Sequence, residues 1–317
     1  MKNAIGILSS RAIIAQMLLS LEIRRFWWAS VVDRVTSNQL NGEDYGFIGG
    51  PGQMVEGLGD IEAREPGSFP WFIRNRHFQL ACKIKNLEFR HAAREKLERY
   101  IQAHTTVAGN HPGVLIKDLV NTAETATCYD GEAFFATSHP VLDATQSNLI
   151  TKTVVSAAAP TEAEIEMALL EAIARIYTLT DDQGNPVNDG LSAFEVACPA
   201  AIWPHVLKVI AKLRLNGGGD SVLANGQSVE VGADGFRFRV RPNLVPGMTG
   251  TLFDLYAQTE RDGAPFIWQV LEDTEEKFLG LDSEYSTVNG HVLAVLRRSY
   301  NMAFGRYQRA VRTKLTE

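Results

Sequence analysis

The spacing of apolar residues divides the chain into predicted helices and strands. Residues 78–84 alternate between apolar and polar side chains, which predicts a strand. Residues 87–104 and 113–126 carry apolar side chains at helical spacing, and the stretch AGNHP between them predicts a break. We therefore expect one strand followed by two separate amphipathic helices.

The middle of the chain, residues 141–265, also mixes the two patterns. Thr161 and Glu164 form a capping-box pattern, which starts a predicted helix whose apolar face runs from Ile165 to Ile176. A buried strand is predicted at 193–199, and the helix after it contains Pro204 in its first turn or at a kink. These elements predict one α/β lobe.

The C-terminal part has strand patterns at residues 263–273, 291–304 and 305–315. Strands at the end of a chain have to pair with earlier ones, so we expect all three beside the helices of residues 88–127. One lobe would then be built from both sides of the middle lobe.

Residues 41–70 are rich in glycine and contain three prolines, a composition that excludes a helix. The segment is too long for an ordinary connection. Together with the predicted strand after it, an extended two-stranded hairpin explains the region. Residues 1–40 form an N-terminal arm, in which Trp27 and Trp28 pack either on the chain's own core or on a neighbouring subunit.

Composition indicates an ordinary globular protein, because 45% of the 317 residues are hydrophobic and 21% are charged. The formal net charge of −6 argues against a surface that binds phosphates as a whole. The three cysteines lie far apart without a CxxC spacing, so we predict no disulfide framework or zinc site, and a reducing compartment fits best. We recognise no secretory signal and no apolar run long enough to span a bilayer.

The stretch CYDGEAFFATSHP, residues 128–140, places a thiol, carboxylates and an imidazole close together in the sequence. A nucleophilic pair of Cys128 and His139, with the imidazole oriented by Asp130, Glu132 or Asp143, is one interpretation. A packing loop with Phe134 and Phe135 pointing inward is the other, and we favour it because buried cysteines are usually inert. The sequence has no phosphate loop, HExxH or GxSxG motif, so we predict no catalytic residue, cofactor or metal.

A basic cluster near the C-terminus has two interpretations, a nucleic-acid contact or a solvated or subunit-pairing face of a sheet. The negative net charge of the whole chain favours the solvated or subunit-pairing face. Its members are Arg297, Arg298, Arg306, Arg309, Arg312 and Lys314.

Five stretches, taken in order, resemble the major head subunits of Mu-like bacteriophages and prophages, the gpT family. They are YGFIGGPG, FIRNRHFQLACKIKNLEF, the run from HPGVLIKDLVNTAETA into TCYDGEAFFATSHPV, FEVACPAAIWPHVLKVIAKL and GAPFIWQVLED. The succession extends over roughly residues 40–310, and residues 1–40 match least well.

The resemblance implies a capsid protein with the α+β Hong Kong 97-type fold. It implies an N-terminal arm (1–42), an extended E-loop hairpin (43–80), a P-domain with a spine helix and a sheet (81–127 and 266–317) and an inserted A-domain (128–265). We place the spine helix at 112–125 rather than at 88–104.

The implied function is self-assembly through pentamers and hexamers into the icosahedral head shell around the double-stranded DNA of a tailed phage, in the host cytoplasm. Portal, scaffold or protease and decoration proteins are expected partners, and no membrane is expected. Aromatic and arginine side chains dominate interface energetics. We therefore predict subunit contacts, with contacts inside the chain as the alternative, at Trp27, Trp28, Tyr45, Phe47, Trp71, Phe72, Arg74 and Arg76.

Two other functions stay open at this point. A bacterial nanocompartment shell has the same fold and would enclose a cargo protein, so an adjacent cargo gene would favour it. A cysteine hydrolase would lose its activity on Cys128→Ala.

Overall fold

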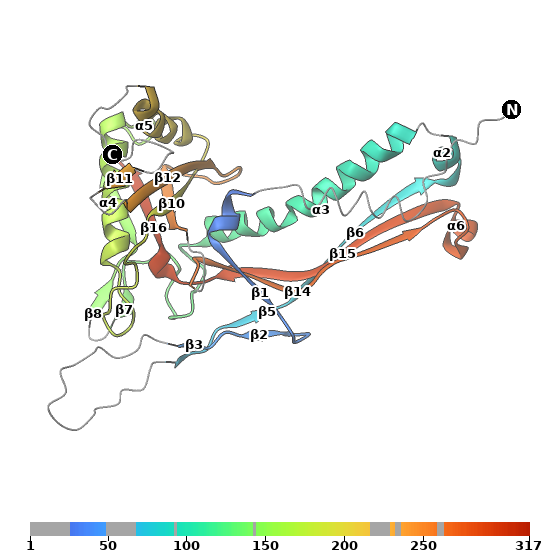
Figure 1. Cartoon of the computed structure of the whole chain (residues 1–317), viewed down its shortest axis with the longest axis horizontal. Coiled ribbons are helices and arrows are strands. Elements are labelled where there is room, and N and C mark those ends of the chain that lie inside the picture. The colour runs from blue at the N-terminus through green and yellow to red at the C-terminus, as the bar shows by residue number, and fades with distance from the viewer. Residues whose placement is uncertain are drawn as a thin grey trace.

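The computed structural model describes residues 26–48, 68–91, 94–141, 144–215, 229–231, 236–258 and 263–317. Figure 1 shows a long sheet with one long helix beside it, and at one end of this sheet a second lobe with its own sheet and helices. The mixed α+β class predicted from the sequence is confirmed. The first part of the predicted N-terminal arm, residues 1–25, lies outside the described residues.

The long sheet has four strands, in the order β1 (Val32–Thr36), β14 (Phe266–Leu279), β15 (His291–Phe304) and β6 (Arg76–Lys85). β1 is parallel to β14, and the other neighbours are antiparallel. β6 contains the alternating stretch 78–84, and β14 and β15 contain two of the C-terminal strand patterns. Segments from both sides of the middle lobe therefore build this sheet, as predicted.

One long helix, α3 (Arg94–Thr122), lies along the long sheet (Figure 1). The predicted break at AGNHP is wrong, because α3 continues through Pro112. A proline inside a helix costs about 3 kcal/mol. Tertiary contacts hold this turn, since the His111 Nδ1 lies 2.6 Å from the hydroxyl of Tyr300 on β15. Residues 94–104 and 112–122, which make up most of the two segments considered for the spine, are parts of α3.

Two short helices close the far end of the long sheet. α2 (Asn86–His91) follows β6, and α6 (Glu284–Asn289) connects β14 to β15. The Asn86 side-chain amide donates to the Ser286 carbonyl at 3.1 Å, and the Ser286 hydroxyl donates to the Asn86 side-chain oxygen at 2.9 Å. These bonds join the two helices.

The second lobe is built on a six-stranded sheet with α4 (Glu162–Thr178) and α5 (Trp203–Leu215) packed against it. The capping box of Thr161 and Glu164 is present, and Pro204 lies in the first turn of α5. The opposite side of the sheet contributes Tyr256 and Ala310 to a core shared with the long lobe. The strand order is β11 (Val229–Val231), β12 (Phe236–Leu244), β10 (Ala193–Cys198), β13 (Leu252–Ala257), β16 (Ala310–Thr316) and β9 (Leu149–Thr153).

The last strand departs from the prediction that all the terminal strands pack beside the helices of 88–127. β16 pairs with β13 and β9 in the second lobe. A one-turn helix, η2 (Tyr307–Arg309), follows β15, and Val311 and Leu315 on β16 are buried in the core under α4 and α5. Burial of these apolar side chains explains why the chain crosses between lobes.

The predicted hairpin is present in its described residues. β2 (Gly42–Asp44) pairs with β5 (Phe72–Arg74), and β3 (Phe47–Ile48) pairs with β4 (Ser68–Phe69), both antiparallel. Figure 1 shows this two-stranded hairpin leaving the long sheet and pointing away from α2 and α6. None of the helices within the described ranges is long and apolar enough to cross a membrane.

Candidate functional site

The stretch from Cys128 to His139 forms a tight loop that enters the strand pair β7 (His139–Val141) and β8 (Ala144–Gln146). The Gly131 amide donates to the Cys128 carbonyl at 3.1 Å, and Gly131 has a φ of 91°, a left-handed value that favours glycine. The Glu132 amide donates to the Asp130 carboxylate at 3.2 Å. Asp130 and Gly131 therefore act as turn residues.

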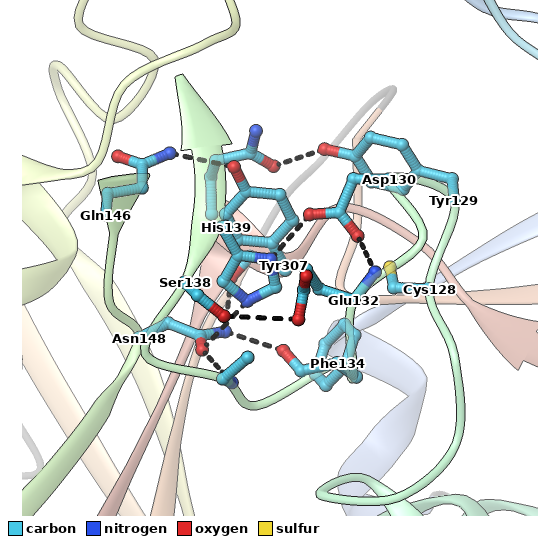
Figure 2. A network of polar contacts seen from close by, with 12 residues as sticks. Cys128, Tyr129, Asp130, Glu132, Phe134, Ser138, His139, Gln146, Asn148 and Tyr307 are labelled. Atoms are coloured by element: carbon cyan, nitrogen blue, oxygen red, sulfur yellow. Dashed lines mark hydrogen bonds and ion pairs between the residues drawn. The ribbon is translucent and has the colours of Figure 1, made fainter. Parts of the chain in front are cut away.

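His139 is the centre of a buried polar network behind this loop (Figure 2). Its Nδ1 lies 2.5 Å from the Asp130 carboxylate, and its Nε2 lies 3.1 Å from the side-chain oxygen of Asn148. The ring stacks on Tyr307 with 3.6 Å between the ring centroids. The Tyr307 hydroxyl accepts from the Gln146 side-chain amide at 2.8 Å, which joins the network to β8.

The hydrogen bonds of Asn148 define the role of the imidazole. The Asn148 amide nitrogen donates to the carbonyls of Phe134 (2.8 Å) and Tyr307 (3.4 Å), and its side-chain oxygen accepts from the Ala136 amide (3.0 Å). A flipped amide would put its oxygen against two carbonyls, so the oxygen faces His139. The Nε2 of His139 then donates to Asn148, and its Nδ1 faces the carboxyl group of Asp130.

The thiol of Cys128 does not point toward the imidazole of His139. It is 1% exposed and donates to the Gly305 carbonyl at 3.5 Å. Burial raises the pKa of the Cys128 thiol well above its ordinary value, and the nearby Asp130 carboxylate raises it further. A thiol without thiolate character is a poor nucleophile, and the two nitrogens of His139 are occupied by Asp130 and Asn148. The arrangement does not form a nucleophile and base pair.

The two phenyl rings of the motif confirm the packing interpretation. Phe134 and Phe135 are buried, and Phe134 stacks on Phe304 with 4.5 Å between centroids. The motif therefore closes the core between the two lobes, where it contacts the end of β15 and the start of β14 through Phe266.

We predict that the thiols of the folded chain resist alkylation. Burial raises the pKa of Cys82, and it raises the pKa of Cys198 to about 12. Ellman's reagent at mildly alkaline pH should label the native protein at least about a hundredfold more slowly than the chain unfolded in guanidinium chloride. Rapid native labelling that disappears with Cys128→Ala, but persists with Cys198→Ala, would reopen the question of a reactive thiol.

The two tryptophans predicted at subunit contacts have different environments in the structure. Trp28, in the one-turn helix η1 (Trp27–Ser30), is 2% exposed and packs edge-on against Trp268 with 5.6 Å between the ring centroids. Trp28 therefore packs on the chain's own core, which was the alternative to a subunit contact. Trp27 is half-buried and lies 6.1 Å from the ring of Tyr256.

The predicted contacts on the hairpin are more accessible. Phe72 is 58% exposed, and Arg74 and Arg76 are exposed. Trp71 and Tyr45 are half-buried, and the Trp71 indole N–H and the Tyr45 hydroxyl lack a hydrogen-bond partner within the described residues. The side chain of Phe47 lies outside the described residues.

Buried polar side chains fix the base of the hairpin, which sequence reasoning missed. The Gln269 amide on β14 donates to the Ile73 carbonyl at 3.0 Å and to the Asn75 side-chain oxygen at 2.6 Å. The Asn75 amide donates to the Ser37 hydroxyl at 3.0 Å and to the Gln39 carbonyl at 2.7 Å. These bonds join the arm, the hairpin and the long sheet, so the direction of the hairpin is set at Asn75.

The C-terminal basic cluster does not form one solvated face. Arg297 is exposed, and Arg298 forms an ion pair with Asp273 at 2.9 Å. Arg312 is buried and pairs with Asp254 at 2.7 Å, so the interpretation of a solvated or subunit-pairing face is wrong for this residue. The reason is that β16 lies inside the six-stranded sheet and not at a free edge.

Comparison with known proteins gives a family and a fold. Residues 19–172 match the model of a family described as Mu-like prophage major head subunit gpT. The fold resembles that of the bacteriophage PhiM1 mature capsid, with 12% identity, a TM-score of 0.58 and coverage of 93% of this chain and 88% of that chain. No curated protein matches the sequence.

Two further solved structures are similar. The procapsid of bacteriophage JBD30 has 15% identity and a TM-score of 0.53, with coverage of 96% of this chain and 73% of that chain. A virus-like particle from Pyrococcus furiosus has 10% identity and a TM-score of 0.51, with coverage of 95% and 96%. The fold is thus shared with phage capsid proteins, and residues 19–172 are similar to the Mu-like gpT family of major head subunits.

Proposed function

We propose that copies of this chain assemble through pentamers and hexamers into a closed icosahedral shell around the double-stranded DNA of a tailed phage. The observation that carries the proposal is the hairpin of β2 to β5, which leaves the body of the subunit with an exposed aromatic side chain. An arm of this kind gains contact area on a neighbour that a compact surface does not offer.

The rigid base of the hairpin supports this role. Gln269 and Asn75 are buried, and their side-chain amides donate hydrogen bonds to backbone carbonyls on the two sides of the hairpin base. Phe69 contacts Tyr129 of the motif loop, with 5.9 Å between the ring centroids. A hairpin held at its base presents Phe72, Arg74 and Arg76 in one orientation, so less entropy is lost when a neighbour binds.

The proposal includes the division of the chain implied by the family. Residues 1–42 form the arm, 43–80 the hairpin, 81–127 and 266–317 the sheet domain, and 128–265 the inserted domain, except that β16 adds a strand to the sheet of the inserted domain. Subunit contacts are proposed at Trp27, Tyr45, Phe47, Trp71, Phe72, Arg74 and Arg76. Trp28 supports the arm from within the chain.

The family match favours a phage head over a nanocompartment shell. A major head subunit requires a portal and either a scaffold or a protease, and decoration proteins bind some shells; these partners are part of the proposal. The virion is then the location of the mature protein. A genome neighbourhood with a cargo gene in place of terminase and portal genes would favour the compartment instead.

We predict that Phe72→Asp prevents assembly without unfolding the subunit. An exposed residue contributes little to the stability of its own chain, so the free energy of unfolding should change by less than about 0.5 kcal/mol. A charge at an interface anchor should lower the yield of shells by about tenfold or more. Negative-stain electron microscopy and light scattering measure the shells, and guanidinium denaturation measures the stability.

Val155→Asp is the matched control, because Val155 is also exposed but lies in the second lobe, outside the proposed contacts. This variant should form shells at the normal yield. Normal assembly of Phe72→Asp would contradict the hairpin contact, and absence of shells from the wild-type chain with its partners would contradict the proposed function itself.

A further inference from the structure

The middle of α3 has a sequence that does not favour a helix by itself. Gly109, Pro112 and Gly113 lie inside the helix, and glycine and proline are the two residue types least favourable in a helix interior. The buried side chains are also small here, at Thr105 and Ala108, and a groove lies between α3, β6 and β15. This part of the helix therefore depends on larger side chains that reach the long sheet, and His104 and His111 are two of them.

His104 contacts β6 with a ring that has no acceptor for a second proton. One ring nitrogen is hydrogen-bonded to the Leu80 backbone, and Nε2 is buried without a partner among the described residues. Burial lowers the pKa of His104, and the hydrogen bond to Leu80 offsets only part of this effect. A proton added to Nε2 would be a buried donor without an acceptor, so the packed helix favours the neutral ring.

The titratable groups on the elements around His104 do not compensate an added charge. Cys82 on β6 and Tyr100 on α3 hydrogen-bond to each other; burial raises the pKa of Cys82, and Cys82 raises the pKa of Tyr100. Both therefore stay uncharged in the pH range in which histidine titrates. Glu276 pairs with Leu296 and faces the same side of the sheet, but it lies on β14, which β15 separates from β6.

His111 lies between two aromatic rings and two arginines. Its Nδ1 is 2.6 Å from the Tyr300 hydroxyl, and its ring centroid is 4.3 Å from that of Phe78. The guanidinium groups of Arg298 and Arg76 lie over the Tyr300 and Phe78 rings, at 4.9 and 5.1 Å from their centroids. Burial lowers the pKa of His111, and the positive charges of Arg76 and Arg298 lower it further.

Two carboxylates face this arrangement without reversing its effect. Asp118, two turns further along α3, raises the pKa of His111, but its side chain is 62% exposed and solvent screens its charge. Asp273 on β14 forms ion pairs with both Arg298 (2.9 Å) and Arg34 (2.6 Å), so two arginines share one carboxylate. The surroundings of His111 consequently favour the neutral ring as well.

Both histidines couple the packing of α3 to pH. A histidine with a lowered pKa binds fewer protons in the packed helix than in the released helix, where its pKa is about 6.5. The stabilisation is complete above about pH 6.5 and is lost as the pH falls from there through the lowered pKa. Mild acid should therefore weaken the contact between α3 and the sheet while exposed carboxylates are still ionised.

We propose that residues 104–113 of α3 form a pH-sensitive element, which mild acid releases from the long sheet by protonating His104 and His111. Ile101 and Ile116, which are buried on either side, hold the flanking turns in place. The release takes place within one subunit and needs no neighbour. The proposal thus goes beyond the shell function and does not depend on it.

Hydrogen exchange of the full chain, followed by mass spectrometry at about pH 7.5 and about pH 5.5, tests the proposal. After correction for the intrinsic exchange rate, the protection of peptides within residues 104–116 should be about fivefold or more lower at the acid pH. α4 contains no histidine and is the internal reference, so its protection should change by less than about twofold. Equal protection of the α3 peptides at the two pH values, or an equal fall in α4, would overturn the proposal.

Histidine variants assign the effect to the two rings. His104→Gln combined with His111→Gln keeps hydrogen-bonding side chains but removes both titrations, so the protection of α3 should no longer depend on pH. His91→Gln is the matched control, because His91 is exposed on α2, and it should retain the full acid response. An acid response of the double variant as large as that of the wild-type chain would also overturn the proposal.

The two single variants serve the same purpose if the double variant does not fold, since each should reduce the acid response. Shell formation is not a readout here, so failure of this proposal is distinct from failure of the shell function.

Discussion

Arg312→Ala should lower the free energy of unfolding by about 3–5 kcal/mol, the cost of leaving a buried charge without its partner. The side chain of Arg312 is 4% exposed, and two of its nitrogens donate to the two oxygens of the Asp254 carboxylate at 2.7 Å each. Asp254 is fully buried. Differential scanning calorimetry and guanidinium denaturation of the subunit measure the loss.

The position of Arg312 in the fold explains why the effect should be large. Its guanidinium also donates to the Val120 carbonyl at 2.7 Å and to the Glu124 carboxylate at 3.1 Å, so it ties the end of α3 to the six-stranded sheet. Burial alone would raise the pKa of Glu124, but its hydrogen bonds with Lys314 and Arg312 outweigh burial and lower it. Loss of Arg312 therefore loosens the junction between the two lobes.

Two comparisons separate this effect from a general loss of charge. Arg297→Ala removes an exposed arginine of β15 whose ion pair with Glu275 spans 3.6 Å, and it should cost less than about 0.5 kcal/mol. Arg312→Met with Asp254→Leu removes both charges and should be less destabilised than Arg312→Ala alone. A loss below about 1 kcal/mol for Arg312→Ala would contradict the buried pair.

Local patterns predicted the elements that depend on local chemistry. Thr161 and Glu164 form their capping box within a few residues of each other, so sequence spacing alone specified where α4 begins. The alternation of apolar and polar residues at 78–84 likewise predicted a strand with one buried face, and this face of β6 packs on α3. The succession of stretches then indicated the resemblance to the gpT family, which no single motif carries.

Features set by distant contacts were not predicted correctly. Pro112 predicts a helix break in the sequence. In the structure α3 continues through it, because the neighbouring His111 contacts Tyr300 on β15. β16 has an ordinary strand pattern, and only the core under α4 and α5 decides which sheet it joins. Sequence spacing contains no information about either partner.

The candidate site was predicted unevenly for the same reason. Residue type alone indicated both Phe72, which is exposed, and Trp28, which the long lobe buries. The buried polar residues Asn75, Asn148 and Gln269 look like ordinary surface residues in the sequence. Their role depends on which carbonyls surround them, and these come from segments far away along the chain.

Asn148→Ala should be the most damaging single change in the polar network behind the motif. It removes the partner of the Phe134 and Tyr307 carbonyls, of the Ala136 amide and of His139 Nε2. Each buried group left without a hydrogen bond costs about 1–3 kcal/mol. We expect the free energy of unfolding to fall by about 4 kcal/mol or more, measured by guanidinium denaturation, with the thiol of Cys128 becoming reactive to Ellman's reagent as the loop opens.

Asn121→Ala is the matched control for this prediction. Asn121 is exposed near the end of α3 and donates one hydrogen bond to the Gly247 carbonyl at 3.0 Å, so its removal should cost less than about 1 kcal/mol. If both variants lost the same small amount, water would be replacing the amide of Asn148, and the loop would not be closed over the buried pair of His139 and Asp130. A large loss confined to Asn148→Ala would instead establish that the motif, whose residues suggest catalysis, stabilises the junction between the two lobes.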